Sequence, residues 1–122
     1  MPGHIVGFQN SYPSKVWVAI MYYSPASCRE LGDWRTEGWW GLDPGTGAWV
    51  VDTSNRYLAF YAEADDGVVW NGPYGPVRLY WNAFSACWLT LQSPVYETVG
   101  MRGVDLGPSA WNPFFYIVNL VP

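Results

Sequence analysis

The amino-acid sequence predicts one all-β domain, an antiparallel β-sandwich or flattened β-barrel of about eight short strands. Short segments rich in β-branched and aromatic residues recur along the chain, and clusters of glycine, proline and aspartate separate them. No segment has the apolar periodicity of a convincing amphipathic helix. A chain of 122 residues has room for one hydrophobic core, so we expect residues 1–122 to form a single domain.

The clearest strand covers residues 15–23, which read KVWVAIMYY. Its even-numbered residues are Val, Val, Ile and Tyr, and the odd-numbered residues between them are Trp, Ala, Met and Tyr, so both faces are apolar. We therefore expect a central strand, or a strand whose second face is covered by a partner. Residues 24–33 contain proline, glycine and mixed charges, which indicates a loop that can hold a helical turn over residues 26–31.

The other strands are expected between clear turn signals. Residues 34–40 and 49–52 flank the segment DPGTG, in which proline presets φ and glycine accepts a positive φ. Residues 56–63 and 68–70 flank Asp-Asp-Gly, and Asp-Gly between apolar runs is a strong hairpin signal. Further strands are expected at residues 77–81, 87–91, 97–104 and 114–120. The predicted core consists of Val16, Val18, Ile20, Leu58, Phe60, Leu79 and Ile117.

The composition argues against several classes of partner. Only 13% of the residues are charged, the net charge is −4, and the few basic residues are scattered rather than gathered in the stripe that binds phosphates. No apolar run approaches the roughly 18 residues that a membrane helix needs, and no signal-peptide pattern opens the chain. We expect no nucleic-acid partner and no membrane span. The localisation stays open between a cytoplasmic chain and a mature exported chain with an added Met1.

A series of aromatic motifs in the first half of the chain resembles a known bacterial family. The motifs are WVAIMYY at 17–23, WRTEGWW at 34–40, DPG at 43–45, NRY at 55–57 and YAE at 61–63. This order resembles the family described as domain of unknown function 1036, with its VAxxY strand, EGWW…PG hairpin and RYxxxYAE strand. The resemblance covers residues 5–70 and is looser beyond them. It implies a compact β domain, often in exported bacterial proteins, and implies no activity.

Few residues are suited to catalysis or metal binding. His4 is the only histidine and lies near a terminus, so we expect it to face solvent rather than to activate a nucleophile. Cys28 and Cys87 form neither a zinc site nor a redox motif, and are either buried thiols or one disulfide. Asp65 and Asp66 suit a hairpin turn better than a calcium loop. We expect no catalytic residue, no metal and no cofactor.

Glu37 and Glu63 come nearest to a catalytic carboxylate pair. Glycoside hydrolases place two carboxyl groups about 5 to 9 Å apart, and neighbouring strands would bring these two close together. The interpretation that we favour is that they form ion pairs with Arg35, Arg56 or Arg78 or lie at strand ends. A small glycoside hydrolase is therefore only a remote alternative.

The aromatic content is the strongest functional signal in the sequence. The chain has nine tryptophans and nine tyrosines, several of them in adjacent pairs such as Trp39-Trp40. Adjacent residues of a strand point to opposite faces, so some rings must lie on an outer face unless a bulge intervenes. The simplest interpretation is that these rings cover one another within the sandwich.

Two functional hypotheses use the outward rings. The first is a non-catalytic binding or assembly module, in which the rings mediate self-association or contact with another protein, because interfaces are rich in aromatic residues and poor in lysine. The second is a lectin-like module that binds carbohydrate or another small ligand. The candidate ligand or interface residues are Trp34, Glu37, Trp39, Trp40, Arg56, Trp70 and Trp111.

Overall fold

The structure is a computed structural model that describes residues 4–24, 28, 34–53, 55–80, 84–87, 96–106 and 114–122. Ten strands lie within these residues and form two sheets that are not closed into a barrel, which confirms the predicted all-β sandwich. The smaller sheet has the order β10-β1-β4 and contains β1 (His4–Asn10), β4 (Gly47–Thr53) and β10 (Phe114–Leu120). The larger sheet has the order β7-β9-β5-β2-β3-β8, with β6 paired to β5, and contains β2 (Val16–Tyr23), β3 (Trp34–Leu42), β5 (Tyr57–Ala64), β6 (Val69–Trp70), β7 (Tyr74–Tyr80), β8 (Phe84–Cys87) and β9 (Tyr96–Asp105).

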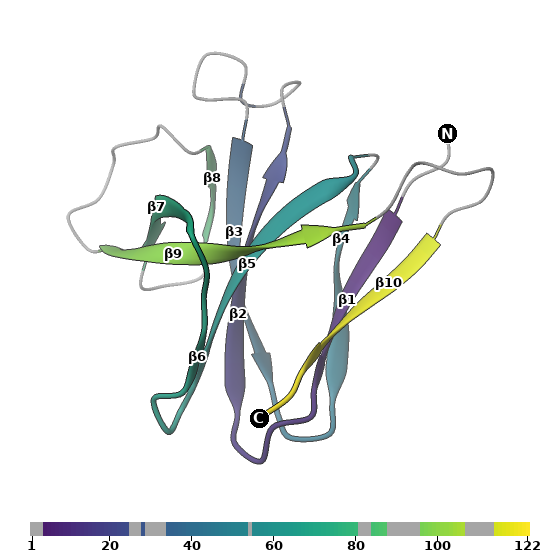
Figure 1. Ribbon diagram of the computed structural model, residues 1–122, viewed down its shortest axis with the longest axis vertical. Helices are drawn as coiled ribbons and strands as arrows, with labels where there is room; N and C mark the ends of the chain where they lie inside the picture. The colour runs from purple at the N-terminus through teal and green to yellow at the C-terminus, as the bar shows by residue number, and fades with distance from the viewer. Residues whose placement is uncertain are drawn as a thin grey trace.

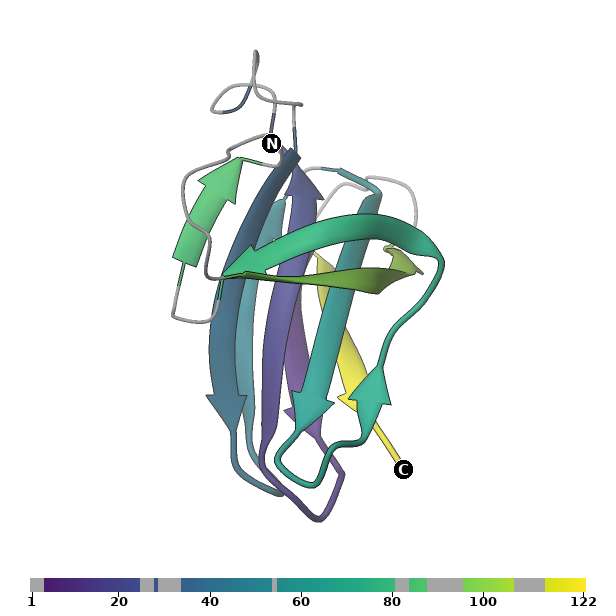
Figure 2. The same cartoon turned by 90° about the vertical axis from the view of Figure 1, so that its left-hand side faces the viewer.

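The long strand β9 changes its pairing partner along its length, and this folds one edge of the larger sheet back over the sheet's outer face. The first half of β9 pairs with β7 and its second half pairs with β5. The β7–β9 pair, which we call the ribbon, therefore crosses the face of the larger sheet that points away from the smaller sheet (Figures 1 and 2). All described pairings are antiparallel except that of β1 with β10, which is parallel.

The central strand β2 has a hydrophobic cluster on each of its faces. Val16, Val18 and Ile20 belong to the inner core between the two sheets, together with β1 and β5 residues. Ala19 and Met21 belong to an outer core, where the ribbon covers the other face. Of the two expected alternatives, the structure confirms the central strand, and the same chain covers its second face. Of the predicted core residues, all except Ile117 are buried.

The small sheet corrects three predictions. Ile117 is 57% exposed, because Tyr116, Val118 and Leu120 are the β10 residues that turn inward. His4 was expected to face solvent but is fully buried, since it lies on the same face of β1 as the core residues Val6 and Phe8. The strand β1 itself was not expected, because Gly7 interrupts its apolar pattern.

The turns follow the sequence signals more closely. In the DPGTG segment Gly45 has a φ of 81°, and the Thr46 amide donates to the Asp43 carbonyl over 3.0 Å. In the hairpin after β5, Gly67 has a φ of 92°. The carboxylate of Asp66 there accepts hydrogen bonds from the Tyr12 hydroxyl at 2.6 Å and from the Val68 amide at 3.1 Å. Asp66 thus serves the turn, as predicted, whereas the Asp65 carboxylate accepts from the Trp17 indole N–H over 2.9 Å.

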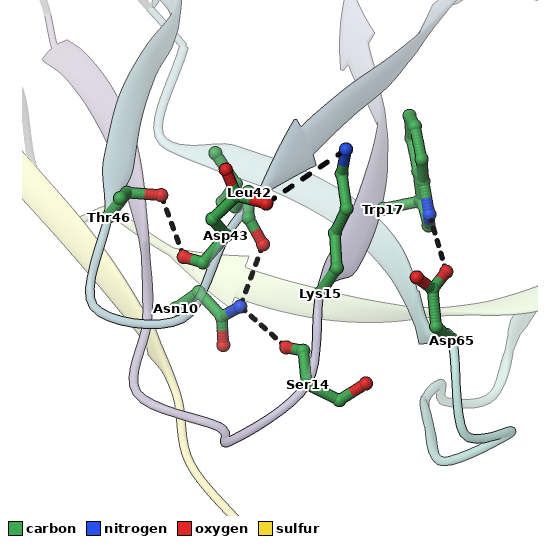
Figure 3. Close-up of polar contacts among 8 residues, drawn as sticks. All are labelled: Asn10, Ser14, Lys15, Trp17, Leu42, Asp43, Thr46 and Asp65. Atoms are coloured by element: carbon green, nitrogen blue, oxygen red, sulfur yellow. Dashed lines mark hydrogen bonds and ion pairs between the residues drawn. The ribbon is translucent and has the colours of Figure 1, made fainter.

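Asn10 joins the loops at the end of the sandwich. It is fully buried, and its side-chain amide donates to the carbonyls of Ser14 and Leu42 over 2.9 and 2.8 Å (Figure 3). Its side-chain oxygen accepts from the Tyr12 amide at 2.8 Å. One side chain therefore ties the β1–β2 loop to the end of β3.

The structure decides between the two alternatives for the cysteines. Cys28 is disulfide-bonded, and the other cysteine of the chain, Cys87, lies in β8. The Cys28 amide donates to the Ser24 carbonyl over 2.9 Å, a spacing of four residues as in an α-helical turn. Otherwise the expected turn at residues 26–31 lies outside the described residues, as do residues 88–91 of an expected strand.

Candidate functional site

Trp39 and Trp40 point to opposite faces of the larger sheet, as the sequence predicted for adjacent strand residues. The register of β2 and β3 shifts between Val18 and Ala19, which leaves Trp39 as an extra residue. Trp40 packs against the inner core, whereas Trp39 packs against the outer core, with its ring edge-on to Tyr61 at 6.2 Å. Both rings are half-buried by their own chain.

Trp70 belongs to the protein core. It is 6% exposed and lies edge-on to the Tyr12 ring, with centroids 5.2 Å apart. Its indole N–H donates to the Val121 carbonyl over 3.1 Å. This placement gives Trp70 a packing role in the core, and Trp111 lies outside the described residues.

The two candidate carboxylates do not meet. Glu37 lies opposite Ile20, and Glu63 lies opposite Trp17. Directly opposed residues share a face of the sheet, and Ile20 and Trp17 are three positions apart, so the glutamates point to opposite faces. The geometry of a glycosidase pair is therefore not present at these two residues.

Glu37 has a local role instead. Its carboxylate accepts hydrogen bonds from the Tyr22 hydroxyl and from the Ser85 hydroxyl, the latter at 3.2 Å. Burial, and then this hydrogen bond to Glu37, raise the pKa of Tyr22 to about 12. Arg56, one of the three arginines proposed as partners for the glutamates, pairs with Asp105 instead.

The Arg56–Asp105 pair is bidentate. The guanidinium donates from Nε at 2.7 Å and from Nη2 at 2.9 Å to the two carboxylate oxygens, and this bonding raises the pKa of Arg56. The same guanidinium lies over the Tyr57 ring, 5.4 Å from its centroid. A fixed, paired charge thus stands beside an exposed aromatic ring.

A cleft of about 500 Å³, which we call the ribbon cleft, opens beside this pair. Its floor is made of small or flexible residues on neighbouring strands, because Met21 lies opposite Ala59 and Ala59 lies opposite Gly103. The full lining consists of Met21, Trp34, Tyr57, Leu58, Ala59, Tyr74, Gly75, Gly103, Val104 and Asp105.

Aromatic rings form the walls of the ribbon cleft. Trp34 packs edge-on against Tyr23 with centroids 5.5 Å apart, while Tyr57 and Tyr74 are 56% and 57% exposed. A Cβ added at Gly103 would lie 2.5 Å from Cε2 of Tyr74, so the Tyr74 ring rests directly on the glycine. Of the candidate residues, Trp34 lines the cleft, and Arg56 is bonded to the lining residue Asp105. Sequence reasoning missed Tyr57 and Tyr74, because their shared site depends on long-range strand pairing.

A second exposed apolar surface lies on the smaller sheet. Trp49 and Phe115 are 54% and 68% exposed, and their ring centroids are 5.5 Å apart. Ile117 and Gly7 lie beside them, and a Cβ added at Gly7 would lie 2.8 Å from the Trp49 ring. We call this surface the small-sheet face. The smaller sheet lies on the side of the sandwich opposite the ribbon (Figure 2).

Comparison of the chain with protein-family models, with curated proteins and with solved structures finds no match. The resemblance to domain of unknown function 1036 therefore stays a prediction. Within the described residues, no helix is long and apolar enough to cross a membrane. The same part of the chain holds no group of three or more His, Cys, Asp or Glu side chains arranged for a metal ion.

Proposed function

We propose that the chain is a non-catalytic binding module that holds a small, mostly apolar, ring-bearing ligand in the ribbon cleft. The observation that carries this proposal is the arrangement of exposed aromatic walls over a floor without large rigid side chains. Trp34 and Tyr57 come from the larger sheet, and Tyr74 comes from the ribbon. A cleft of about 500 Å³ is within the size range of ordinary ligand sites.

The lining favours an apolar ring over a sugar. A carbohydrate brings many hydroxyl groups, and each one that leaves water needs a hydrogen-bond partner. The charged group of the lining, the Asp105 carboxylate, already accepts two N–H groups from Arg56. Flat rings and small floor residues instead suit a planar apolar ligand, which gains most from contact with aromatic faces.

A titration with the neutral dye Nile red tests the proposal, with dye fluorescence as the readout. We expect saturable binding that Trp34→Leu weakens about tenfold, the effect of losing one well-packed ring. Trp17→Leu is the matched control. Trp17 lies on the same face of β2 as Tyr23, the residue that packs against Trp34, but about 20 Å away along the strand. Equal loss in both variants, or no loss in Trp34→Leu, would contradict the proposed site.

Two further measurements define the ligand class and the surface. Phe115→Ser removes an aromatic ring from the small-sheet face and should leave dye binding unchanged. Cellobiose should neither displace the dye nor quench the tryptophan fluorescence. If cellobiose displaces the dye at millimolar concentration, the ligand class of the cleft is carbohydrate and the proposal of an apolar ligand is wrong.

A further inference from the structure

The free edges of the two sheets differ in how they are protected. An edge strand exposes unpaired backbone groups, and proteins protect such edges with short strands, proline, charge or bulges. In this chain β8 has four residues, and β7 carries Pro76 and a register shift. The edge strand β4 carries the extra residue Val50 at a bulge and the exposed, charged Asp52. Each of these three edges has at least one protective feature.

The remaining edge, β10, has none of these features. Its seven residues read FFYIVNL, without charge, proline or glycine. It pairs with β1 in unbroken register from end to end, and among the described residues it has no other pairing partner. A hollow of about 420 Å³ separates residues 116–120 from Phe60, Trp70 and β9 residues 102–105, so among the described residues no strand of the larger sheet packs directly against this part of β10. A regular, neutral strand rich in β-forming residues is a template for pairing with another strand.

One hydrogen bond identifies the backbone groups that face this open edge. The Ser11 amide donates to the Leu120 carbonyl over 3.0 Å, so Leu120 directs its backbone groups towards β1. Backbone groups alternate between the two sides of a strand. Phe115, Ile117 and Asn119 therefore direct their N–H and C=O groups away from β1, towards the free edge.

We propose that a second copy of the chain pairs with this edge, β10 antiparallel to β10, about a two-fold axis at Ile117. In that register Ile117 lies opposite its own copy, and Phe115 lies opposite Asn119. These are the residues whose backbone groups face the edge, so each opposed pair exchanges two hydrogen bonds. A register shifted by two residues leaves part of the strand unpaired. A register shifted by one residue sets residues whose backbone N–H and C=O groups face the free edge against residues whose backbone groups face β1.

The chemistry of the strand favours a second copy over a foreign strand. A two-fold contact places the same surface on both partners, so a charge at the axis would face a like charge. β10 is uncharged, and Ile117 and Phe115 would lie diagonally across the axis and extend the small-sheet face. The net charge of −4 on each copy repels the other copy at long range, so added salt should strengthen the dimer.

Analytical ultracentrifugation of the full chain over a concentration series tests the proposal. We expect a monomer–dimer equilibrium, and Ile117→Lys should raise its dissociation constant at least tenfold, because the lysines would meet at the axis. Val68→Lys is the control, since Val68 is a 40% exposed apolar residue outside β10. A chain that stays monomeric up to about 100 μM, where even a weak contact would show, would overturn the proposal. A dimer that Ile117→Lys does not weaken would overturn it as well.

Oxidative cross-linking tests the register independently. Opposed residues at the axis have Cα atoms about 5.5 Å apart, which is within disulfide range. Ile117→Cys should therefore form a covalent dimer, whereas Phe115→Cys should not, since the two copies of residue 115 are about 13 Å apart along the strands. Wild-type protein gives the background. Cross-linking through residue 115 rather than 117 would exclude this register. If the chain stays monomeric and its β10 edge binds a foreign β strand, the proposal of a second copy is wrong.

Discussion

Removing the Asn10 side chain should cost the fold a large part of its stability. Asn10→Ala deletes three hydrogen bonds, two donated to the Ser14 and Leu42 carbonyls and one accepted from the Tyr12 amide. Each such bond has a net worth of about 0.5–1.5 kcal/mol. The bond to Leu42 is buried, and leaving its carbonyl unpaired adds a desolvation cost of about 1–3 kcal/mol. These terms add up to a loss of about 2.5–7.5 kcal/mol, against an ordinary domain stability of about 5–15 kcal/mol.

Urea unfolding followed by tryptophan fluorescence measures this loss. The midpoint should fall while the slope stays unchanged, because the mutation alters stability rather than the surface exposed on unfolding. Thr46→Ala is the matched control, since its hydroxyl donates to the Asp43 carbonyl at an exposed position of a neighbouring turn (Figure 3). The control should lose less than about 1 kcal/mol.

Asn10→Asp sharpens the test by keeping the shape of the side chain. Its carboxylate replaces the donating amide with an acceptor that faces the carbonyl oxygens of Ser14 and Leu42. At neutral pH we expect a loss at least as large as that of Asn10→Ala. If both variants lose less than about 1 kcal/mol, a cost typical of an ordinary surface change, the reasoning about this residue is wrong.

Two other features give further predictions. Because burial raises the pKa of Tyr22 from 10.0 to about 12, the stability it contributes is complete below pH 10.0 and disappears as the pH rises through about 12. The unfolding free energies of wild type and Tyr22→Phe should therefore converge over that range, and parallel curves would contradict the assignment. A Cβ at Gly100 would collide with the Gly72 carbonyl oxygen, so Gly100→Ala should cost about 1–3 kcal/mol in thermal unfolding. Gly41→Ala should lose less stability, because its added Cβ meets the end of the Trp17 ring and the Lys15 side chain, both of which can move. If Gly100→Ala loses no more stability than Gly41→Ala, the collision with the Gly72 carbonyl is relieved by backbone movement and the prediction is wrong.

The sequence by itself determined the fold class and the features that depend on near neighbours. Strand alternation identified β2 as central, because both of its faces are apolar. Turn chemistry identified the turns at Gly45 and Gly67, since a positive φ is a local requirement. Alternation also predicted that Trp39 and Trp40 point to opposite faces, and they do so although a bulge lies at Trp39.

Only the tertiary structure decided which of two apolar faces is covered. In β10 the sequence offers apolar side chains on both faces, and the pairing with β1 turns Ile117 outward. The ribbon cleft likewise depends on β9 changing its partner from β7 to β5, which brings Tyr57 and Tyr74 to one site. Alternation defines two faces of a strand, but long-range pairing selects the one that faces the core.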